Sequence, residues 1–516
     1  MDFFLSPQCG ARVSRLLADH HVVGLAVSLV QGRRLESRAY GRAALDPPRD
    51  FTADTAVPVG SAAKCLTAAA VALLVADDDA HPDVQWEAEM RHLLPADFAL
   101  PGASDVAVSD LLCHRTGLPR HELALLGSGA ARPDDARSIT RKLRHLALAA
   151  PPRHSFIYCN LTYTVASYLV EAKSGDPFAA YLERRLFEPL HMHSTCLGHA
   201  RAKAKALRIA EGYSWDRKSK QHCVMPHIDG AELQGAGNIF STAGDYAKWI
   251  RAMMQREDPI TEHVFNALTE SRICQDADLD LFYAFGWDVR RYQGHTLLLH
   301  NGGEAGSATV HFFIADLQFG GAIVSNSAHA DSLLGQLMYL FIDEAQRSTS
   351  SPSVHDMSQL ALEEEWPDTA SECGSVASSE DHVYSIDDAM REEEQIVQHL
   401  CPGIKTFQPL LLPLEVYTGR YWNPGYQQII LQARADQLFA DCSERSCGFT
   451  LTYKHICDNT KFIAYMRMAE GGNDIPLSAV FEIENNRAWK VGIRLEDMLP
   501  QHIWFSRLED SSIDGI

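Results

Sequence analysis

Strand-like segments lie near both ends of the first 345 residues, and helical patterns fill most of the region between them. Residues 22–41, "VVGLAVSLVQGRRLESRAYG", hold two apolar runs around a glycine-containing turn, which predicts a β-hairpin. Short strand patterns return between residues 282 and 326. The stretches "LTYTVASYLVEAKSG" (161–175) and "STAGDYAKWIRAMMQ" (241–255) predict amphipathic helices, the first ended by Gly175 and the second capped by Ser241 or Thr242. We therefore expect an α+β domain over residues 1–345, with one antiparallel sheet that joins early and late strands.

The composition changes at about residue 346. Residues 346–404 are rich in Ser, Glu and Asp and lack a sustained apolar face, so we expect a flexible or weakly ordered acidic linker. Between residues 405 and 516, short strand patterns recur at near-regular spacing: "YTGRYWN", "QQIILQAR", "QLFADC", "FTLTYKHI", "KFIAYMRM", "SAVFEIEN", "AWKVGIRL" and "HIWFSRL". They predict a C-terminal domain that is a small antiparallel β-barrel or sandwich.

The charge of the chain limits the partners that it can bind. Its formal net charge is −21, and residues 356–394 alone hold thirteen acidic residues against one basic residue, Arg391. Nucleic-acid binding needs clustered Lys and Arg, so we expect no nucleic-acid partner. No uninterrupted apolar run reaches the length of about 18 residues that a membrane span needs, so we expect no membrane partner either.

The cysteines and the N-terminus bear on location and on metal binding. The N-terminal residues show no basic segment followed by an apolar one, so we expect no signal peptide and a cytoplasmic location. The twelve cysteines are scattered, and Cys442 and Cys447 have no matching His or Cys cluster nearby. We therefore expect reduced, mostly buried thiols, no metal site and no cofactor.

Ser61 and Lys64 lie three residues apart at the start of an apolar, alanine-rich run within "VPVGSAAKCLTAAAVALLVADDD" (57–79). If a helix begins near Ser61, both side chains project from the same face. A serine hydroxyl is a poor nucleophile until a base takes its proton, and a lysine becomes such a base when desolvation lowers its pKa. Taken alone, the tetrapeptide also fits an N-cap serine followed by an ordinary helix lysine.

Other stretches make the pattern more specific. Tyr158 and Asn160 lie in "FIYCNLTY", directly before a predicted helix, and "LLLHNGGEAG" holds His300 to Gly303 at the end of a strand-like run. With "VPVGSAAK", "LLCHRTGLP" and "QGAGNIFSTAGDYAKWI" (234–250), this order resembles the class C β-lactamase family of penicillin-recognising serine enzymes. The family includes D-alanyl carboxypeptidases, D-aminopeptidases, esterases and acyltransferases, and the resemblance covers roughly residues 10–345.

The resemblance implies a role for each matching residue. Ser61 matches the acylated nucleophile, and Lys64 matches the residue that shares or accepts its proton. Tyr158 matches the tyrosine that acts with the lysine as general base and then protonates the leaving group. Asn160 matches the asparagine that binds the acyl side of the substrate, and the backbone N–H groups of Ser61 and Gly303 match the oxyanion hole.

The third motif departs from the β-lactamase pattern, which usually begins with lysine. Here it begins with His300, which is largely neutral at pH 7 from a reference pKa of about 6.5. Asn301 stands where a smaller residue is commoner, and Gly302 follows it. We expect His300, Asn301 and Gly302 to border the substrate, which should be a small, neutral acyl compound and the main partner of this protein.

Three functions are consistent with these residues. The first is a serine hydrolase that forms an acyl-enzyme at Ser61 from an ester, thioester or amide of a small metabolite and releases the acyl group to water. The second is an acyltransferase of secondary metabolism, in which an alcohol or amine accepts the same acyl group. The third is a catalytically silent scaffold on a β-lactamase fold.

The C-terminal barrel resembles the lipocalin-like domain of several family members, through "YTGRYWN" (417–423), and either shapes the acyl pocket or stabilises the enzyme. The oligomeric state is not predicted.

Overall fold

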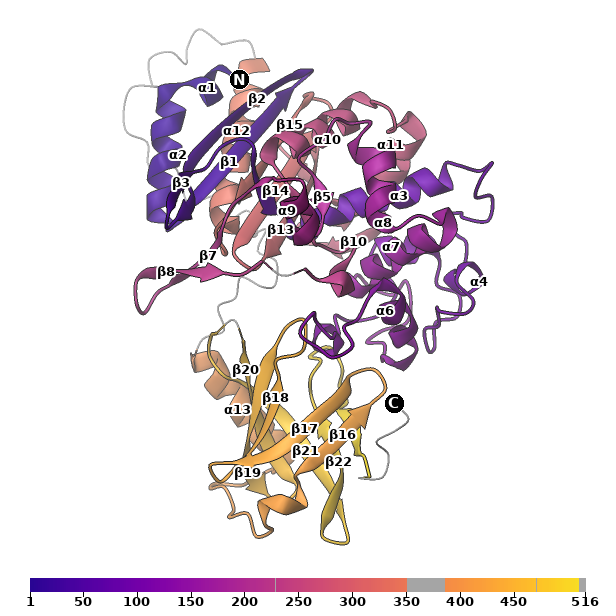
Figure 1. Cartoon of the computed structure of the whole chain (residues 1–516), viewed down its shortest axis with the longest axis vertical. Coiled ribbons are helices and arrows are strands. Elements are labelled where there is room, and N and C mark those ends of the chain that lie inside the picture. Colours follow the sequence, from indigo (N-terminus) through magenta and orange to yellow (C-terminus); the bar gives the residue numbers. More distant parts are fainter. Residues whose placement is uncertain (228, 350–385, 470, 510–516) are drawn as a thin grey trace.

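A computed structural model of the chain describes residues 1–227, 229–349, 386–469 and 471–509 (Figure 1). An α+β domain at the top of the view holds the central sheet, and a separate β-barrel lies below it. This arrangement confirms the two predicted folds, an α+β domain followed by an antiparallel barrel.

The central sheet of the α+β domain is antiparallel and combines the early hairpin with the late strands. Strand β1 (Gly24–Gln31) pairs on one side with β2 and on the other with β15, so the first strands close against the last, as predicted. The described strands of this sheet, in spatial order, are β10 (Ile273–Asp276), β11 (Leu281–Tyr283), β12 (Asp288–Tyr292), β13 (His295–Glu304), β14 (Ser307–Ile314), β15 (Phe319–Ser325), β1, β2 (Arg34–Leu45) and β3 (Pro48–Asp50).

Helices cover both faces of this sheet because its strands carry apolar residues on both sides. In β1, Leu25 and Val27 pack in one apolar cluster with α2 (Pro7–Asp19) and α12 (Asp331–Thr349). Ala26, between them, faces the opposite side and packs with Ala243 of α10 (Ala243–Gln255). The N-cap of α10 is Thr242, whose side chain accepts a hydrogen bond from Asp245 N, and not the alternative Ser241.

A group of helices lies on the α10 side and surrounds α3 (Ala63–Val75), which is buried at every position. A helix that is apolar all round must be enclosed in this way. Its neighbours include α7 (Asn160–Ser174), which ends at Gly175 in a left-handed conformation as predicted. The other described helices of the domain are α1 (Asp2–Leu5), α4 (Met90–Leu93), α5 (Val108–Leu112), α6 (Ala136–Lys142), α8 (Phe178–Leu182), α9 (His199–Ala204) and α11 (Glu262–Thr269), with one π-helical turn, η4 (Glu183–Phe187), and the short 3₁₀ turns η1 (Gly60–Ala62), η2 (Glu122–Ala124), η3 (Leu143–His145) and η5 (Ala231–Leu233).

Short strands complete the α+β domain beside the main sheet. A small sheet brings together β5 (Cys196–Leu197), β9 (Ile239–Ser241), β4 (Thr55–Pro58) and β6 (Arg208–Ile209). Strands β7 (Gly212–Asp216) and β8 (Gln221–Met225) form a hairpin that projects from the domain (Figure 1). The small sheet matters for the site because β4 leads directly into η1 and α3.

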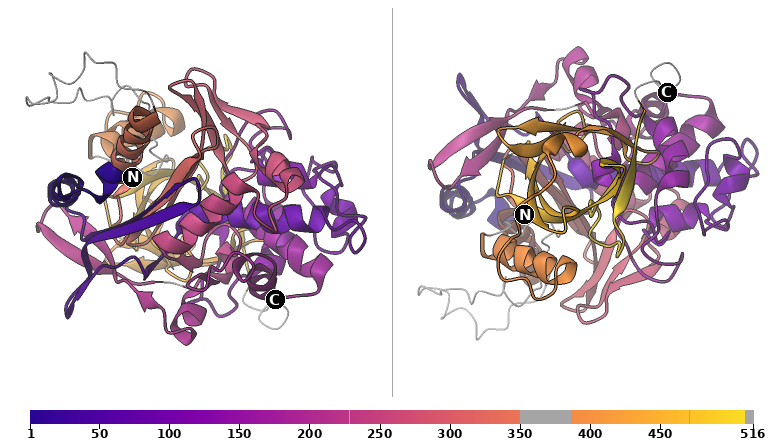
Figure 2. Two further views of the ribbon diagram at one scale, coloured as in Figure 1. Left: turned by 90° about the horizontal axis from the view of Figure 1, so that it is seen from above. Right: turned by 90° about the horizontal axis from the view of Figure 1, so that it is seen from below.

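The C-terminal strands form a closed antiparallel barrel, seen end-on in the right panel of Figure 2. Each predicted strand pattern appears as one strand: β16 (Gly419–Asn423), β17 (Gln427–Arg434), β18 (Gln437–Cys442), β19 (Phe449–Cys457), β20 (Lys461–Met468), β21 (Ile475–Glu484), β22 (Arg487–Ile493) and β23 (Ile503–Arg507). A short turn, η6 (Leu414–Val416), precedes them. The barrel closes where β16 pairs with β23.

The expectation of a weakly ordered linker is wrong for part of residues 346–404. Helix α13 (Ile386–Leu400) lies against β20 and β21 of the barrel, and residues 350–385 lie outside the described part of the chain. Ile396, Val397 and Leu400 pack in one apolar cluster with barrel residues. These apolar side chains stand at helical spacing, a local pattern that the overall Ser- and acid-rich composition of the segment concealed, and packing against the barrel stabilises the helix.

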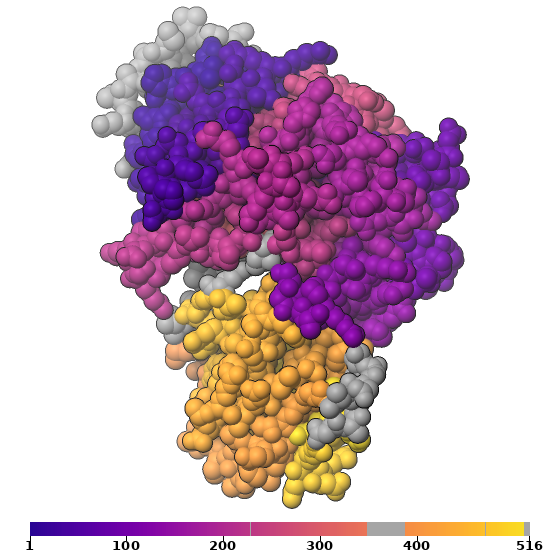
Figure 3. All heavy atoms as spheres, in the orientation of Figure 1, coloured from indigo at the N-terminus to yellow at the C-terminus, as the bar shows by residue number. Residues whose placement is uncertain are grey.

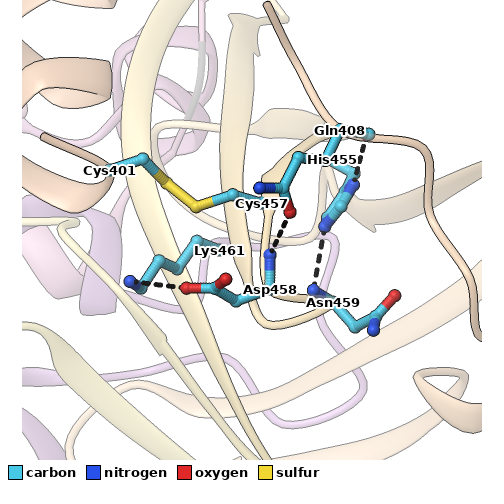
Figure 4. The surroundings of a disulfide bond; sticks show 7 residues. All are labelled: Cys401, Gln408, His455, Cys457, Asp458, Asn459 and Lys461. Atoms are coloured by element: carbon cyan, nitrogen blue, oxygen red, sulfur yellow. Dashed lines mark hydrogen bonds and ion pairs between the residues drawn. A yellow bond between two sulfur atoms is a disulfide. The ribbon is translucent and has the colours of Figure 1, made fainter. Parts of the chain in front are cut away.

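The expectation that all thiols are reduced is also wrong. Cys401, directly after α13, forms a disulfide with Cys457 at the end of β19 (Figure 4). His455 bridges the same region, donating from Nδ1 to Gln408 O at 3.0 Å and accepting from Asn459 N at 3.1 Å. The covalent bond therefore ties the end of α13 to the barrel.

The barrel packs directly against the α+β domain (Figure 3). Residues 125–127 and 444–446 lie side by side, since Ser446 N donates to Leu125 O and Gly127 N donates to Glu444 O, both at 3.0 Å. The main apolar cluster includes residues of α3, of this contact region and of the barrel interior. Within the described ranges we find no helix with the length and apolar content to cross a membrane.

Candidate active site

Ser61 lies on η1, the single turn between strand β4 and helix α3. Lys64 is in the first turn of α3, and its Nζ donates a hydrogen bond to Ser61 Oγ at 3.0 Å. The three-residue spacing places both groups on one face of the turn, as the sequence indicated.

The amino group of Lys64 is fully buried and is held toward Ser61. Its Nζ also donates to Ala236 O at 3.0 Å and lies 4.8 Å from the centre of the Tyr158 ring and 5.6 Å from that of Tyr163. Removal from water disfavours a charged amine, while ring faces and carbonyl oxygens favour it. The site thus holds a lysine that is enclosed by the protein and bonded to Ser61 Oγ and Ala236 O.

Tyr158 reaches Ser61 from a segment that precedes helix α7. Its hydroxyl donates to Ser61 Oγ at 2.8 Å, so Ser61 Oγ contacts both Lys64 Nζ and Tyr158 OH. Ser61 and Tyr158 are partly exposed, unlike Lys64. This arrangement lets a group from solvent reach the serine oxygen while the lysine stays enclosed.

Asn160 is the first residue of α7, two residues after Tyr158. Its Nδ2 donates to Glu122 Oε1 at 2.6 Å, which fixes the orientation of its amide. Glu122 Oε1 is also 3.5 Å from Arg120 Nη1, and the Arg120 guanidinium lies 5.3 Å from the centre of the Tyr158 ring. The sequence analysis did not single out Arg120 or Glu122, because their contact with Asn160 and Tyr158 spans about 40 residues and follows no spacing rule.

Strand β13 brings Gly302 and Gly303 against η1. A Cβ atom added to Gly302 would lie 2.0 Å from Val59 O, and one added to Gly60 would lie 2.4 Å from Gly303 O. Only glycine permits so close an approach, so Gly302 serves packing in this structure. Gly303 is exposed beside Ser61, where the resemblance expects the second oxyanion donor.

His300 and Asn301, both expected to border the substrate, differ from each other in exposure, and their contact with a substrate stays a prediction. His300 is buried, donates from Nδ1 to Asn301 O at 2.6 Å and accepts at Nε2 from the hydroxyl of Tyr283 at 3.0 Å. Burial lowers the pKa of His300, and the nearby Lys64 lowers it further, so the ring is neutral. Asn301 lies next to it on β13, is partly exposed and pairs with Val310 of β14. The structure does not bring His300 into hydrogen-bond contact with Ser61, Tyr158 or Asn160.

A second buried histidine, His114, supports the loop that carries Tyr158. Its Nδ1 accepts from Cys159 N at 3.1 Å, and its ring centre lies 4.4 Å from that of Tyr158. Burial lowers the pKa of His114 well below its ordinary value, so it packs as a neutral ring. The stretch "LLCHRTGLP" was part of the recognised pattern, but nothing in its spacing identified this contact.

The structure thus brings Ser61, Lys64 and Tyr158 into direct contact, with Gly303 against Gly60 and Asn160 bonded to Glu122. Among the residues for which coordinates are described, no cluster of three or more His, Cys, Asp or Glu side chains has an arrangement able to hold a metal ion. The serine oxygen accepts hydrogen bonds from an amine and a phenol, which are groups that nucleophilic acyl transfer can use.

Comparisons with known proteins agree with this geometry. The family model described as Beta-lactamase matches residues 11–339, and a domain of unknown function, DUF3471, matches residues 408–507. The chain is similar to Unguisins hydrolase ungD' of Aspergillus campestris, with 29% identity over 512 residues that cover 97% of this chain and 91% of the relative. It is also similar to Penicillin-binding protein 4* of Bacillus subtilis, with 23% identity over 310 residues, covering 56% of this chain and 65% of the relative.

Solved structures share this fold, one of them over nearly the whole chain. The octameric penicillin-binding protein homologue from Pyrococcus abyssi has a TM-score of 0.58 and 17% identity, and the match covers 97% of this chain and 99% of that one. D-amino acid amidase from Ochrobactrum anthropi SV3 has a TM-score of 0.54 and 21% identity, covering 67% of this chain and all of its own. Because the Beta-lactamase model spans well over half of the sequence, the chain belongs to the β-lactamase family of serine hydrolases.

Proposed function

We propose that this protein forms an acyl-enzyme at Ser61 with an ester, thioester or amide of a small metabolite and releases the acyl group to water. The observation that carries the proposal is the position of Ser61 Oγ, 3.0 Å from Lys64 Nζ and 2.8 Å from Tyr158 OH. A serine oxygen held by two groups that can exchange protons is the arrangement that nucleophilic catalysis requires.

The proposed reaction uses each group in turn. Tyr158, as phenolate, or Lys64, as neutral amine, accepts the proton of Ser61 as its oxygen attacks the acyl carbon. The backbone N–H groups of Ser61 and Gly303 stabilise the oxyanion, a contribution for which one donor is worth about 3 kcal/mol in other serine hydrolases. Tyr158 then protonates the leaving group, and water attacks the acyl-enzyme with the same groups acting in reverse. Asn160 holds the acyl side of the substrate.

Two features favour a neutral substrate and water as acceptor. The third motif supplies the neutral His300 and no lysine, so no fixed positive charge there favours a substrate carboxylate. The relatives that match almost the whole chain carry names of hydrolases, including Unguisins hydrolase ungD of Aspergillus violaceofuscus, which is 29% identical over 467 residues. Transfer of the same acyl group to an alcohol or amine is the remaining alternative.

Activity profiling tests the proposal. Wild type, Ser61→Ala and a surface control, Ser219→Ala, are compared on ester, thioester, D-amino-acid amide and nitrocefin substrates. Turnover of a neutral ester, thioester or amide that Ser61→Ala abolishes and Ser219→Ala preserves is the expected result. Activity that survives Ser61→Ala would exclude this mechanism. Product analysis with an added alcohol separates hydrolysis from transfer, and failure of a fluorophosphonate to label Ser61 would favour the scaffold.

A further inference from the structure

The three residues Arg120, His121 and Glu122 connect the barrel to the candidate active site. The outer two face the site, where Glu122 accepts from Asn160 Nδ2 at 2.6 Å and Arg120 lies over the ring of Tyr158. The middle residue, His121, faces the barrel. Because the outer residues flank the middle one directly, whatever fixes His121 also fixes both contacts with the site.

Two barrel residues bind His121, one at its backbone N–H group and one at its ring. Glu496, after strand β22, accepts from His121 N at 2.8 Å, and the hydroxyl of Tyr426, between β16 and β17, lies 2.8 Å from His121 Nδ1. His121 Nε2 lies 2.9 Å from Ala147 O, which can only accept, so Nε2 carries the proton and Nδ1 accepts from Tyr426. His121 adopts a left-handed conformation with φ of 49°, which a residue with a side chain keeps only when its surroundings hold it.

These contacts are closed to solvent. His121 is 1% exposed, Tyr426 2% and Glu496 8%, so water does not compete for their polar atoms. A buried hydrogen-bonding group that loses its partner carries the full cost of its desolvation. The barrel contacts are therefore strong constraints on the main chain of residues 120–122.

A second contact acts on the other side of the site. Ser446, between β18 and β19, donates to Glu232 Oε1 at 2.6 Å, and Glu232 is buried on η5. Four residues later, Ala236 O accepts the hydrogen bond from Lys64 Nζ. The barrel thus contacts two of the segments that border the Ser61, Lys64 and Tyr158 group, residues 120–122 and 232–236.

We propose that the barrel is a working part of the active site, in which Tyr426 and Glu496 are positioning residues that hold Arg120 and Glu122, and through them Tyr158 and Asn160, in their reactive arrangement. The inference rests on the proposed function at Ser61 and assigns to the barrel a role that a passive stabilising domain would not have. A small displacement of a catalytic group costs on the order of 100-fold in rate, so loosening this contact should be visible in kinetics.

The test compares variants that break or keep each hydrogen bond. Glu496→Ala removes the acceptor for His121 N, whereas Glu496→Gln keeps an oxygen there, and Tyr426→Phe removes only the hydroxyl. The matched control is Tyr417→Phe, another buried barrel tyrosine, whose hydroxyl bonds within the barrel to Asn459 O at 2.6 Å. Each variant is assayed on two esters, one with an amide on its acyl side and one without, and its thermal unfolding is measured.

We expect Glu496→Ala and Tyr426→Phe to lower kcat/KM by about ten-fold or more, with a larger loss on the ester that carries the acyl-side amide, because Asn160 is displaced. Glu496→Gln should recover most of this loss, and Tyr417→Phe should leave both kinetic values near wild type despite a similar loss of stability. Equal kinetics for Tyr426→Phe and Tyr417→Phe would overturn the proposal. If Glu496→Ala does not fold, Tyr426→Phe, which removes one atom, still carries the comparison.

A double-mutant cycle gives an independent readout. Glu122→Gln and Tyr426→Phe act on one connected segment, so the fold-loss in kcat/KM of the double variant should differ from the product of the two single losses. A double-variant loss equal to that product would contradict the connection. Ser61→Ala, measured on the same substrates, separates the two proposals. If it abolishes turnover while the barrel variants do not change it, only the positioning role fails; if it keeps turnover, the proposed function fails.

Discussion

The replacement of Lys64 by methionine separates a catalytic lysine from a structural one. Methionine has a similar length and volume, so Lys64→Met should leave no large cavity in the fully buried site. The variant removes the donor to Ser61 Oγ and to Ala236 O. Ser61 Oγ keeps its hydrogen bond with Tyr158, so the main structural loss is one buried carbonyl without this donor.

The magnitudes of the opposing effects can be estimated. An unsatisfied buried carbonyl costs about 1–3 kcal/mol. Burying a charged amine costs several kcal/mol, and this cost disappears in the variant. The free energy of unfolding should therefore stay within about 2 kcal/mol of the wild-type value. Activity should fall by about 10²- to 10⁴-fold, the usual contribution of a positioned acid–base group.

Urea denaturation and substrate turnover measure the two effects on the same preparation. Lys64→Arg is a useful companion because it keeps a positive charge but presents a larger planar group that cannot act as a base. A folded Lys64→Met variant with activity within ten-fold of wild type would refute the catalytic role. A loss of more than about 4 kcal/mol in stability would show that the lysine mainly supports the fold.

Three further predictions test packing, protonation and the disulfide. Gly302→Ala should destabilise the protein by about 1–3 kcal/mol and reduce activity, because its Cβ would lie 2.0 Å from Val59 O. By contrast, Gly335→Ala in α12, where a Cβ meets nothing within 4 Å, should stabilise the protein by up to about 1 kcal/mol in urea denaturation. Equal changes in unfolding free energy for Gly302→Ala and Gly335→Ala would contradict this account. Burial lowers the pKa of His121 from 6.5 to about 4, so the unfolded chain protonates first as pH falls, and stability is full above about pH 6.5 and lost toward pH 4. Protonation of His121 should therefore lower the unfolding free energy by about 2 kcal/mol between pH 7.5 and pH 5. His121→Asn should remove this part of the decline. The same dependence of unfolding free energy on pH in the variant and in wild type would refute the prediction. Reduction of the Cys401–Cys457 bond, which joins residues 56 positions apart, should lower the unfolding free energy by about 2–4 kcal/mol. Replacement of an exposed free thiol, Cys274→Ser, is the control. Free thiols at positions 401 and 457 in the unreduced protein would contradict the prediction.

Features with a local cause were predictable from the sequence. The spacing of Ser61 and Lys64 fixes their contact because residues three apart share one face of a helical turn. Short strand-like runs at near-regular spacing predicted the barrel, and strand patterns near both ends of the first domain predicted a sheet that joins early and late strands. These patterns repeat over short windows, so they survive without knowledge of the rest of the chain.

Features that depend on distant parts of the chain were not predictable. Helix α13 gains its stability from the barrel surface, and the Cys401–Cys457 bond is one of many pairings that twelve cysteines allow. The contact of His121 with Glu496 joins residues 375 positions apart. Similarly, the motif gave no sign that His300 would bond to the hydroxyl of Tyr283 and to the carbonyl oxygen of Asn301.

The central claim is that Ser61 Oγ, which is hydrogen-bonded to Lys64 Nζ and to Tyr158 OH, carries the acyl group during turnover. Peptide mass spectrometry of protein quenched during turnover of an activated ester measures this directly. One acyl group on the peptide that contains Ser61, absent from Ser61→Ala, is the predicted result. An acyl group on another residue would contradict the account. An unmodified Ser61 peptide, together with turnover that persists in Ser61→Ala, would contradict it as well.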